Sequence, residues 1–171
     1  MITQTARRIS IFTLTITLLS VLAACSTQPE SRPSTYPASH PAKGQVERSR
    51  PIGERAAIVA LSQVGVPYRY GGSTRSGFDC SGLVQYSYGQ AGKRIPRTTG
   101  QLWSSSSTVA RSELQAGDLL FFKIEGKMSH VGLYLGEQQF VHAPSSGRTV
   151  SVEKLTSPFY SSALIRVGRP H

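Results

Sequence analysis

A single cysteine and two histidines give the clearest chemical signal in this 171-residue sequence. Cys80 lies where a loop passes into a predicted helix, and His130 and His142 lie in two later segments that read as strands. A thiolate is a strong nucleophile, and an imidazole is well suited to take up its proton near neutral pH. These residues therefore predict a nucleophilic cysteine served by a histidine base.

The setting of Cys80 bears on its reactivity. The residue falls in the first turn of a helix predicted from about Asp79 to Gln90. Free backbone N–H groups and the positive end of the helix dipole favour a thiolate there. Asp79 opposes this effect unless its carboxylate turns away to cap the helix. The alternative interpretation is that Cys80 is a small buried apolar residue.

The two histidines lie in consecutive predicted strands joined by the loop GEQ, residues 136–138. A three-residue loop pairs Leu135 with Gln139 and places His130 and His142 on one face of the hairpin, within imidazole reach of each other. A loop one residue longer or shorter sends them to opposite faces. The sequence thus predicts a base held by a second imidazole, conditional on the register. Because the histidines lack HxxxH or HExxH spacing, we expect no metal and no other cofactor.

Residues 1–24 have the composition of a signal peptide. Arg7 and Arg8 precede an uncharged, mostly apolar run of 16 residues that ends in small residues and is short for a membrane span. The run leads into LAAC, which resembles the bacterial lipobox and implies that Cys25 carries diacylglycerol as the first residue of the mature chain. Cys80 is then left without a disulfide partner.

Residues 25–52 are expected to form a lipid-bearing, disordered tether. Prolines recur every four residues between positions 29 and 41, and apolar residues are nearly absent. Such a segment buries too little surface to offset the entropy of ordering it. We therefore predict one catalytic domain over residues 53–171.

The chain is basic, with 19 Lys and Arg against 9 Asp and Glu. Loss of residues 1–24 removes two arginines and no acidic residue, which leaves an excess of eight positive charges. Because no run of Lys or Arg has interleaved aromatic residues, we expect no nucleic-acid partner. Anionic lipid headgroups and acidic wall polymers are the expected partners of such an exported protein.

The order of predicted elements favours an α+β fold. Ala57, Ile58, Leu61 and Val64 have helical spacing in a first helix that Gly65 would end, and the cysteine-bearing helix follows. Short apolar segments separated by turn signals read as strands at residues 119–124, 130–136, 139–143, 149–153 and 163–168. We predict N-terminal helices packed on a small antiparallel sheet of about five to six strands.

Five motifs occur in the order seen in one known family. They are PYRYGGSTRSGFDCSGLV (67–84), PRTTGQ (96–101), QAGDLLFF (115–122), SHVGLYLG (129–136) and FVHA (140–143). With these motifs the sequence resembles the NlpC-type cysteine peptidases, papain-like enzymes that cleave peptidoglycan stem peptides. The likeness spans about residues 54–168, is greatest to short outer-membrane lipoproteins with a Cys-His-His triad, and implies a papain-like fold.

The resemblance also implies roles for individual residues. The family's nucleophile falls on Cys80, its general base on His130, and its third polar residue, which orients the base, on His142. The tyrosine associated with oxyanion stabilisation in the family falls on Tyr68. None of these matched positions departs from the family pattern.

Three further polar residues are weaker candidates for substrate binding. Arg97 suits a carboxylate of the stem peptide, although a surface or capping role fits its sequence context equally well. Asp79 and Ser81 flank the nucleophile, and they either contact substrate or cap the helix.

The resemblance implies a lipid-anchored murein endopeptidase that acts in cell-wall growth or remodelling. It slightly favours the D-alanyl–diaminopimelate cross-link over the γ-D-glutamyl–diaminopimelate bond. Ser26 stands where an aspartate would favour the inner membrane, so we expect the periplasmic face of the outer membrane. A non-catalytic wall-binding or scaffold lipoprotein, and an amidase or acyltransferase on the same fold, stay open as alternatives. We expect a monomer, and the sequence leaves a protein regulator open.

Overall fold

A computed structural model describes residues 48–145 and 147–171. The predicted signal peptide, the predicted lipidation site Cys25 and most of the predicted tether lie outside these described residues. Within the described ranges, no helix combines the length and the apolar character needed to cross a membrane.

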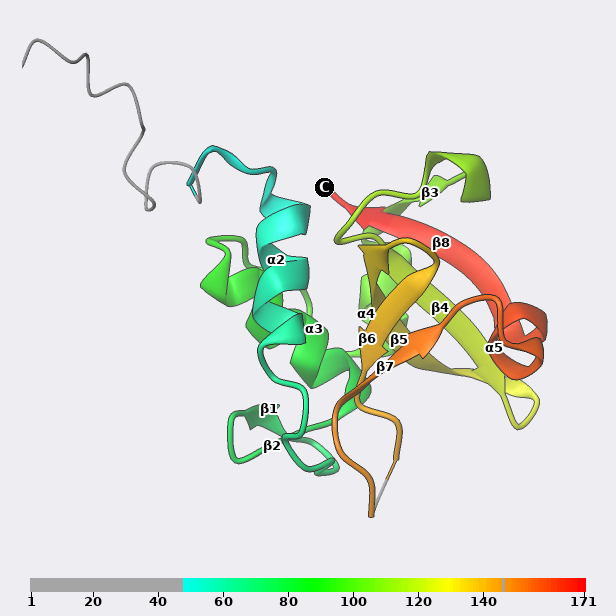
Figure 1. Cartoon of the computed structure of the whole chain (residues 1–171), viewed down its shortest axis with the longest axis horizontal. Helices are drawn as coiled ribbons and strands as arrows, with labels where there is room; N and C mark the ends of the chain where they lie inside the picture. Colours follow the sequence, from blue (N-terminus) through cyan, green and yellow to red (C-terminus); the bar gives the residue numbers. More distant parts are fainter. Residues whose placement is uncertain (1–47, 146) are drawn as a thin grey trace, which may run out of the picture. The chain divides into compact units, whose positions relative to one another are not determined.

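Helices α2 (Ile52–Leu61) and α3 (Cys80–Gln90) pack against each other on one side of the main sheet (Figure 1). The buried face of α2 consists of three alanines, Ala56, Ala57 and Ala60. Small side chains at a helix contact allow the axes to approach closely. The short side chains of α2 therefore bring α3, with Cys80 at its start, into a tightly packed layer.

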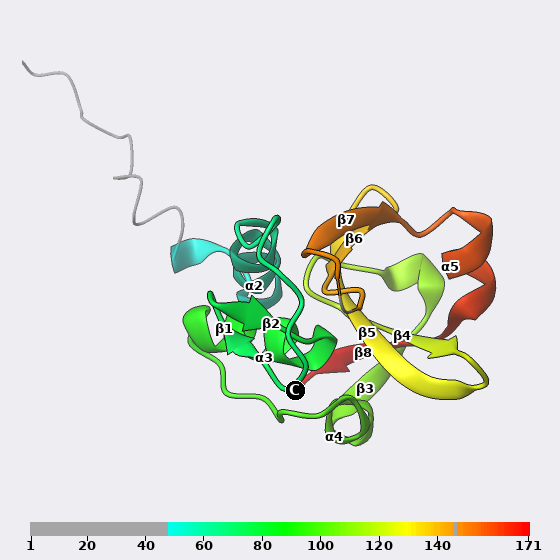
Figure 2. The same ribbon diagram turned by 90° about the horizontal axis from the view of Figure 1, so that it is seen from below.

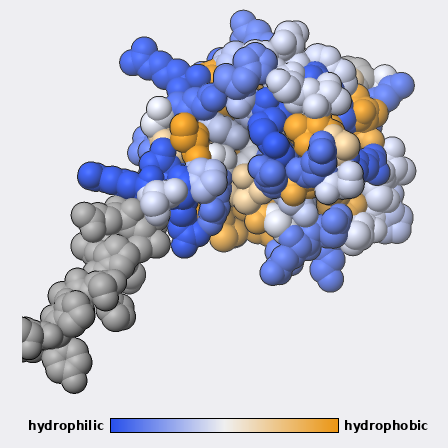
Figure 3. Space-filling view, turned by 90° about the horizontal axis from the view of Figure 1, so that it is seen from above, coloured by the Kyte–Doolittle hydropathy of each residue, from blue (hydrophilic) through white to orange (hydrophobic). Residues whose placement is uncertain are grey.

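The apolar pattern predicted for the first helix is only partly right. Helix α2 ends at Leu61, before the predicted stop at Gly65, and Ile58, Leu61 and Val64 are 39%, 47% and 49% exposed. Because alanines and larger apolar residues alternate around this helix, spacing alone does not reveal which face is buried. Apolar side chains also remain exposed elsewhere: on the face of the molecule drawn in Figure 3, they lie in separate patches among polar ones.

Six antiparallel strands form the main sheet in the order β3–β8–β4–β5–β6–β7 (Figure 2). The strands are β3 (Ser106–Val109), β4 (Leu119–Ile124), β5 (Lys127–Gly136), β6 (Gln139–His142), β7 (Ser151–Lys154) and β8 (Leu164–Pro170). The predicted α+β class, with helices on a small antiparallel sheet, is confirmed. Strand β3 is an addition to the five predicted strands, since its sequence SSTV lacks the apolar character used to recognise them.

The other elements are short. A two-stranded sheet precedes α3, and three small helices lie before or between strands of the main sheet. These elements are β1 (Ser73–Thr74), β2 (Gly77–Phe78), α4 (Thr99–Ser104), a 3-10 helix (Arg111–Glu113) and α5 (Pro158–Ala163).

The hairpin of β5 and β6 turns more tightly than predicted. Gly136, not Leu135, pairs with Gln139, and the ladder shifts by one residue between Tyr134 and Gly136. The two-residue turn has both φ angles positive, 50° at Glu137 and 57° at Gln138, as a tight hairpin turn requires. A shorter turn plus a one-residue irregularity preserves the register that a three-residue loop would give.

The sheet is apolar on both faces. Toward the helices α2 and α3, its buried residues include Leu119, Phe121, Val131, Leu133 and Val141. On the other face, where α5 packs against β4, they include Leu120, Phe122, Tyr134 and Phe140. Because side chains alternate between the faces of a strand, His130 and His142 fall on this second face, against the same aromatic residues.

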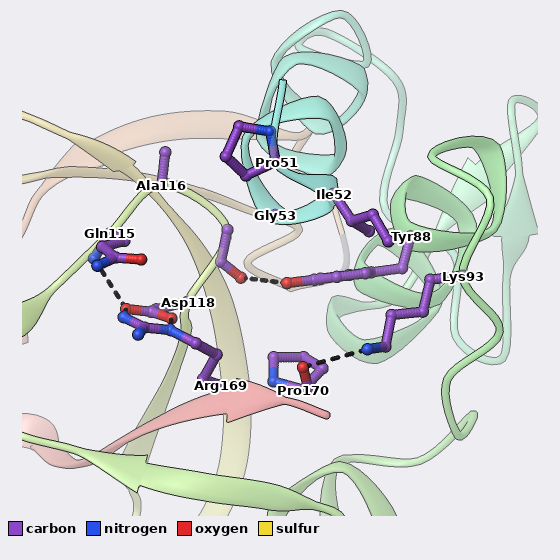
Figure 4. A pocket seen from close by; sticks show the side chains of 11 residues that line it. Pro51, Ile52, Gly53, Tyr88, Lys93, Gln115, Ala116, Asp118, Arg169 and Pro170 are labelled. Carbon is purple, nitrogen blue, oxygen red and sulfur yellow. Dashed lines mark hydrogen bonds and ion pairs between the residues drawn. The ribbon is translucent and has the colours of Figure 1, made fainter. Parts of the chain in front are cut away.

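A cavity of about 140 Å³ lies where the start of α2, the end of α3, the loop before β4 and the end of β8 approach one another (Figure 4). Beside it, the Tyr88 hydroxyl donates to the Gly117 carbonyl at 2.7 Å. Arg169 binds both carboxylate oxygens of the buried Asp118, at 2.7 and 2.8 Å. The bond of Tyr88 fastens α3 to the loop before β4, at the end of the helix opposite to Cys80, and the pair of Arg169 and Asp118 ties that loop to β8.

Candidate active site

Cys80 begins helix α3, as predicted, and its thiol lines an open cleft of about 500 Å³. The N-cap residue is Asp79, whose Oδ1 accepts a hydrogen bond from the Gly82 N–H at 2.6 Å. The sulfur lies 3.8 Å from Thr99 Oγ1 and 4.0 Å from the carbonyl oxygen of Ser129. The first turn of α3 thus brings the thiol against strand β5.

Burial has the largest influence on the Cys80 thiol and raises its pKa above the ordinary value. The charge of Asp79 acts in the same direction. Hydrogen bonds from the backbone at Val131 and Ser81 and from the side chain of Thr99 lower the pKa, as expected near a helix N-terminus, but they do not offset burial. The resting cysteine is therefore a thiol that needs a base.

A network of hydrogen bonds surrounds the N-cap. Arg97 binds both carboxylate oxygens of Asp79, with Nη1–Oδ1 and Nη2–Oδ2 distances of 2.9 and 2.6 Å. The same guanidinium donates to Ser81 Oγ at 2.9 Å and to the Gly72 carbonyl at 3.2 Å. Asp79 Oδ2 also accepts from the Gly71 N–H at 3.0 Å. Capping is thus the observed role of Asp79 and Arg97 supports it, while substrate contact by Asp79, Ser81 and Arg97 stays a prediction.

Gly82 allows the loop before α3 to lie against the first turn of that helix. A Cβ atom added at Gly82 would clash with the carbonyl oxygen of Gly72 and come within 3.0 Å of Asp79 Oδ1. Glycine is the residue that permits such a close backbone approach. The cap that fixes the position of Cys80 therefore depends on a helix position without a side chain.

Tyr68 lies in the same cleft as the thiol. The residues that line this cleft are Tyr68, Tyr70, Gly71, Asp79, Cys80, Ser81, Arg97, Thr98, Thr99 and Ser129. Burial, followed by the charges of Cys80 and Asp79, raises the pKa of the Tyr68 hydroxyl, so it stays protonated at neutral pH and can donate a hydrogen bond. Within residues 48–145 and 147–171 this hydroxyl has no hydrogen-bond partner, which leaves it available to a ligand.

His130 and His142 lie together, as predicted from the hairpin. Nε2 of His130 and Nδ1 of His142 are 2.7 Å apart, the two rings are nearly perpendicular, and the residues are 5% and 1% exposed. Burial lowers the pKa of His130 to about 4. Burial and the nearby charges of His130 and Arg148 lower the pKa of His142 to about 3. Both imidazoles are therefore neutral at neutral pH.

The thiol and the imidazole pair lie at neighbouring positions of strand β5. The thiol contacts the carbonyl of Ser129, and the imidazole pair begins with the next residue, His130. Cys80 contacts Ser129 from the cleft, whereas His130 and His142 line a second cavity, of about 330 Å³, toward α5. Among the described residues, no hydrogen bond joins the Cys80 sulfur to His130, and Nδ1 of His130 has no partner. Catalytic hydrogen bonds are often long before substrate binds, and Nδ1 is the nitrogen left for the thiol proton.

Sequence reasoning did not identify three residues that contact the predicted catalytic groups. Thr99 and Ser129 touch the sulfur, and the Tyr160 hydroxyl lies 3.4 Å from His142 Nε2. Thr99 and Ser129 do lie within the family-like motifs PRTTGQ and SHVGLYLG, but their chemistry alone did not mark them. Tyr160 belongs to the six-residue helix α5, which is too short to show a periodic pattern.

Comparison with known proteins places these features in a family. The NlpC/P60 family matches residues 65–169. The chain is 42% identical over 126 residues to murein DD-endopeptidase MepH of Escherichia coli K12, covering 68% of this chain and 46% of that protein. It is 41% identical over 97 residues to E. coli K12 murein DD-endopeptidase MepS/murein LD-carboxypeptidase, covering 56% of this chain and 51% of that protein. The chain thus spans about half the length of these relatives.

Solved structures show the same fold. The crystal structure of an NlpC/P60 family protein from Bacillus cereus superposes with a TM-score of 0.65 and 31% sequence identity, covering 70% of this chain and 40% of that one. The papain-like arrangement expected from the sequence, with helices before a small antiparallel sheet, is therefore confirmed.

Proposed function

We propose that this chain, which belongs to the NlpC/P60 family, is a cysteine peptidase that hydrolyses peptide bonds of peptidoglycan. One arrangement carries the proposal: the thiol at the start of α3 meets β5 one residue before a histidine whose Nε2 is held by a second imidazole. The thiol on α3 thus contacts strand β5 at the residue next to a neutral, oriented histidine. A binding protein without catalysis would have no need of this combination.

The chemistry begins at Cys80. His130 takes the thiol proton at Nδ1, and the thiolate attacks the carbonyl carbon of the scissile peptide bond. The negative charge that develops on the carbonyl oxygen is stabilised by the Cys80 backbone N–H and the Tyr68 hydroxyl, which share the cleft. The raised pKa of Tyr68 suits this role, since the hydroxyl keeps its proton.

The second half of the reaction returns the proton. The imidazolium of His130 protonates the leaving amine, the C–N bond breaks, and a thioester to Cys80 remains. A water molecule, deprotonated by His130, then attacks the thioester and releases the acid product and the thiol. His142 accepts a hydrogen bond from His130 Nε2–H throughout, which keeps Nδ1 directed at the reacting atoms.

The bond cleaved in this proposal is the D-alanyl–diaminopimelate cross-link. Its support is the naming of MepH and MepS, at 42% and 41% identity, as murein DD-endopeptidases. The other bond considered is the γ-D-glutamyl–diaminopimelate bond within one stem. The two differ in their products, because only cleavage of the cross-link converts muropeptide dimers into intact monomers.

Digestion of purified sacculi by the full chain tests this function. The wild-type protein should release monomers from cross-linked muropeptides, identified by mass. Cys80→Ala should release none and keep the wild-type circular dichroism spectrum and Tm, since the change removes one sulfur atom from a partly exposed site. Products cut within the stem would replace the proposed bond, and full release by Cys80→Ala would contradict the enzyme proposal itself.

The proposal includes a lipid anchor at Cys25 and attachment to the periplasmic face of the outer membrane. Its support is the sequence LAAC after an apolar run, followed by Ser26. Labelled palmitate should mark the wild-type protein and not Cys25→Ser, and membrane fractionation should find the label in the outer membrane. An unlabelled wild-type protein would contradict the anchor without affecting the peptidase proposal.

A further inference from the structure

The hydrogen-bonded histidines continue to a third side chain on α5. His130 Nε2 lies 2.7 Å from His142 Nδ1, and the other nitrogen of His142, Nε2, lies 3.4 Å from the hydroxyl of Tyr160. We propose that Tyr160 is a positioning residue that fixes the tautomer of His142 and, through it, the tautomer of His130. The proposal rests on the catalytic role assigned to His130 above.

The tautomers follow from the demands of the reaction. If His130 Nδ1 takes the thiol proton, the neutral ring must carry its hydrogen on Nε2. His130 Nε2–H then donates to His142, so His142 Nδ1 must be the acceptor. A neutral His142 consequently carries its hydrogen on Nε2, and that N–H needs an acceptor of its own. Among the described residues, the Tyr160 oxygen lies within reach of that N–H.

Burial makes this acceptor important. His142 is 1% exposed, so an unpaired N–H on its ring would lose its interaction with water without replacement. The competing tautomer of His142, with the hydrogen on Nδ1, would set two donors against each other at the 2.7 Å contact with His130. His130 would then have to move its hydrogen to Nδ1, which blocks the proton acceptor needed by Cys80.

The surroundings of Tyr160 hold its hydroxyl in place. Its ring lies 4.9 Å from Phe140 and 5.5 Å from Phe122, centroid to centroid, and is perpendicular to the ring of His142. Ser157 caps α5 by accepting from the Tyr160 N–H, which anchors the backbone at the same residue. The tyrosine is thus fixed by packing on the sheet and by the helix start.

The tyrosine contributes an uncharged acceptor. Burial and the charge of Glu153 raise the pKa of Tyr160, while Arg148 acts in the opposite direction, so the phenol keeps its proton at neutral pH. A neutral hydroxyl accepts a hydrogen bond through a lone pair and adds no net charge beside two neutral imidazoles. Its role is therefore to orient the pair, in contrast to a carboxylate, which would also attract a proton.

The direct test reads the tautomers by ¹⁵N NMR of the imidazoles in the full chain, with the His142 signals assigned from a His142→Gln variant. Wild-type His142 should show the Nε2–H form. Tyr160→Phe, which keeps the packed ring, should shift it toward the Nδ1–H form. Tyr134→Phe is the matched control, because Tyr134 belongs to the same apolar cluster and, among the described residues, its hydroxyl accepts a hydrogen bond from the Gln138 backbone and not from a histidine. Identical tautomers in wild type and Tyr160→Phe would overturn the proposal.

Kinetics provide a second test. Tyr160→Phe should lower kcat about three- to tenfold with KM unchanged, the size expected for one hydrogen bond. The same change made in a His142→Ala background should have no further effect, because the tyrosine acts through that histidine. An equal loss in both backgrounds would show a merely structural role. If the wild-type chain hydrolyses no muropeptide, the proposed function fails, while the NMR result still decides the tautomer.

Discussion

The candidate active site has a cysteine side and a histidine side with different surroundings. Cys80 contacts strand β5 at Ser129, and the histidine side begins at the next residue, His130. On the cysteine side, Cys80 lines an open cleft of about 500 Å³ whose walls carry the ion pair of Asp79 and Arg97. On the histidine side, His130 and His142 are almost fully buried and pack on aromatic rings. One side is built from charges and a helix start, and the other from apolar surface.

The difference matches what each group has to do in the proposed reaction. A nucleophile that attacks a polymer must be reachable from solvent, so its position is fixed by a cap and an ion pair and not by enclosure. A histidine base must be neutral before it can take a proton, and burial favours the neutral form. The polar cleft thus presents the thiol, and the apolar cluster prepares the base.

After Cys80→Ala, the largest effect is expected on the histidine side. His130→Ala should lower kcat/KM for muropeptide cleavage by at least about 10³-fold, nearly as much as Cys80→Ala, because the two residues act as one unit. His171→Ala is the control, since that exposed histidine contacts Ser107 and no residue of the site. Activity that survives in His130→Ala would assign the base to another group.

Acid should weaken the histidine side selectively. The pKa of His130 falls from 6.5 to about 4 on folding, so between these pH values the unfolded chain binds a proton that the folded chain does not. The free energy of unfolding should therefore be highest above pH 6.5 and decrease as pH falls toward 4, by about 3 kcal/mol from this residue alone.

Urea unfolding at a series of pH values measures this loss. His142→Gln removes the second buried imidazole, whose pKa is also lowered, and should reduce the slope of stability against pH. A wild-type protein equally stable at pH 7 and pH 4.5 would contradict the burial of neutral histidines.

A smaller effect is expected on the cysteine side. Asp79→Ala removes the N-cap of α3 and should lower the free energy of unfolding by about 1–2 kcal/mol. Asp79→Asn keeps an acceptor for the Gly82 N–H and should lose less, although it weakens the pairing with Arg97. Equal losses in the two variants, measured by urea unfolding, would show that the ion pair stabilises this region and the cap does not.

Sequence patterns predicted the placement of Cys80, His130 and His142 better than they predicted the elements around them. The start of α3 was predictable because Asp79 is a strong N-cap residue beside an apolar helix. The shared face of His130 and His142 was predictable because it depends on the pairing register of their two strands, which a short loop limits to a few choices. The tighter turn at Glu137 and Gln138 kept the predicted register at the histidines because the ladder gained a one-residue irregularity.

The remaining features lacked a local signal. Strand β3 is polar and is held in the sheet by pairing with β8, whose partner residues lie 58 to 64 positions later in the chain, so only the tertiary structure reveals it. Helix α5 has six residues, too few for periodicity. The buried face of α2 was misjudged because Ile58 and Leu61 are more apolar than the alanines that pack against the sheet and α3. Each of these errors concerns the tertiary contacts of a segment and not its intrinsic preference for helix or strand.

The tight turn between β5 and β6 has a consequence for how this gene can change. Surface loops usually tolerate inserted or deleted residues. Here a single added or lost codon between Tyr134 and Gln139, unless absorbed as a further irregularity, would rotate His142 to the opposite face of the sheet and separate it from His130. An affinity tag or fluorescent label should be inserted elsewhere. At this turn, selection that keeps the two histidines must also keep the number of residues between them.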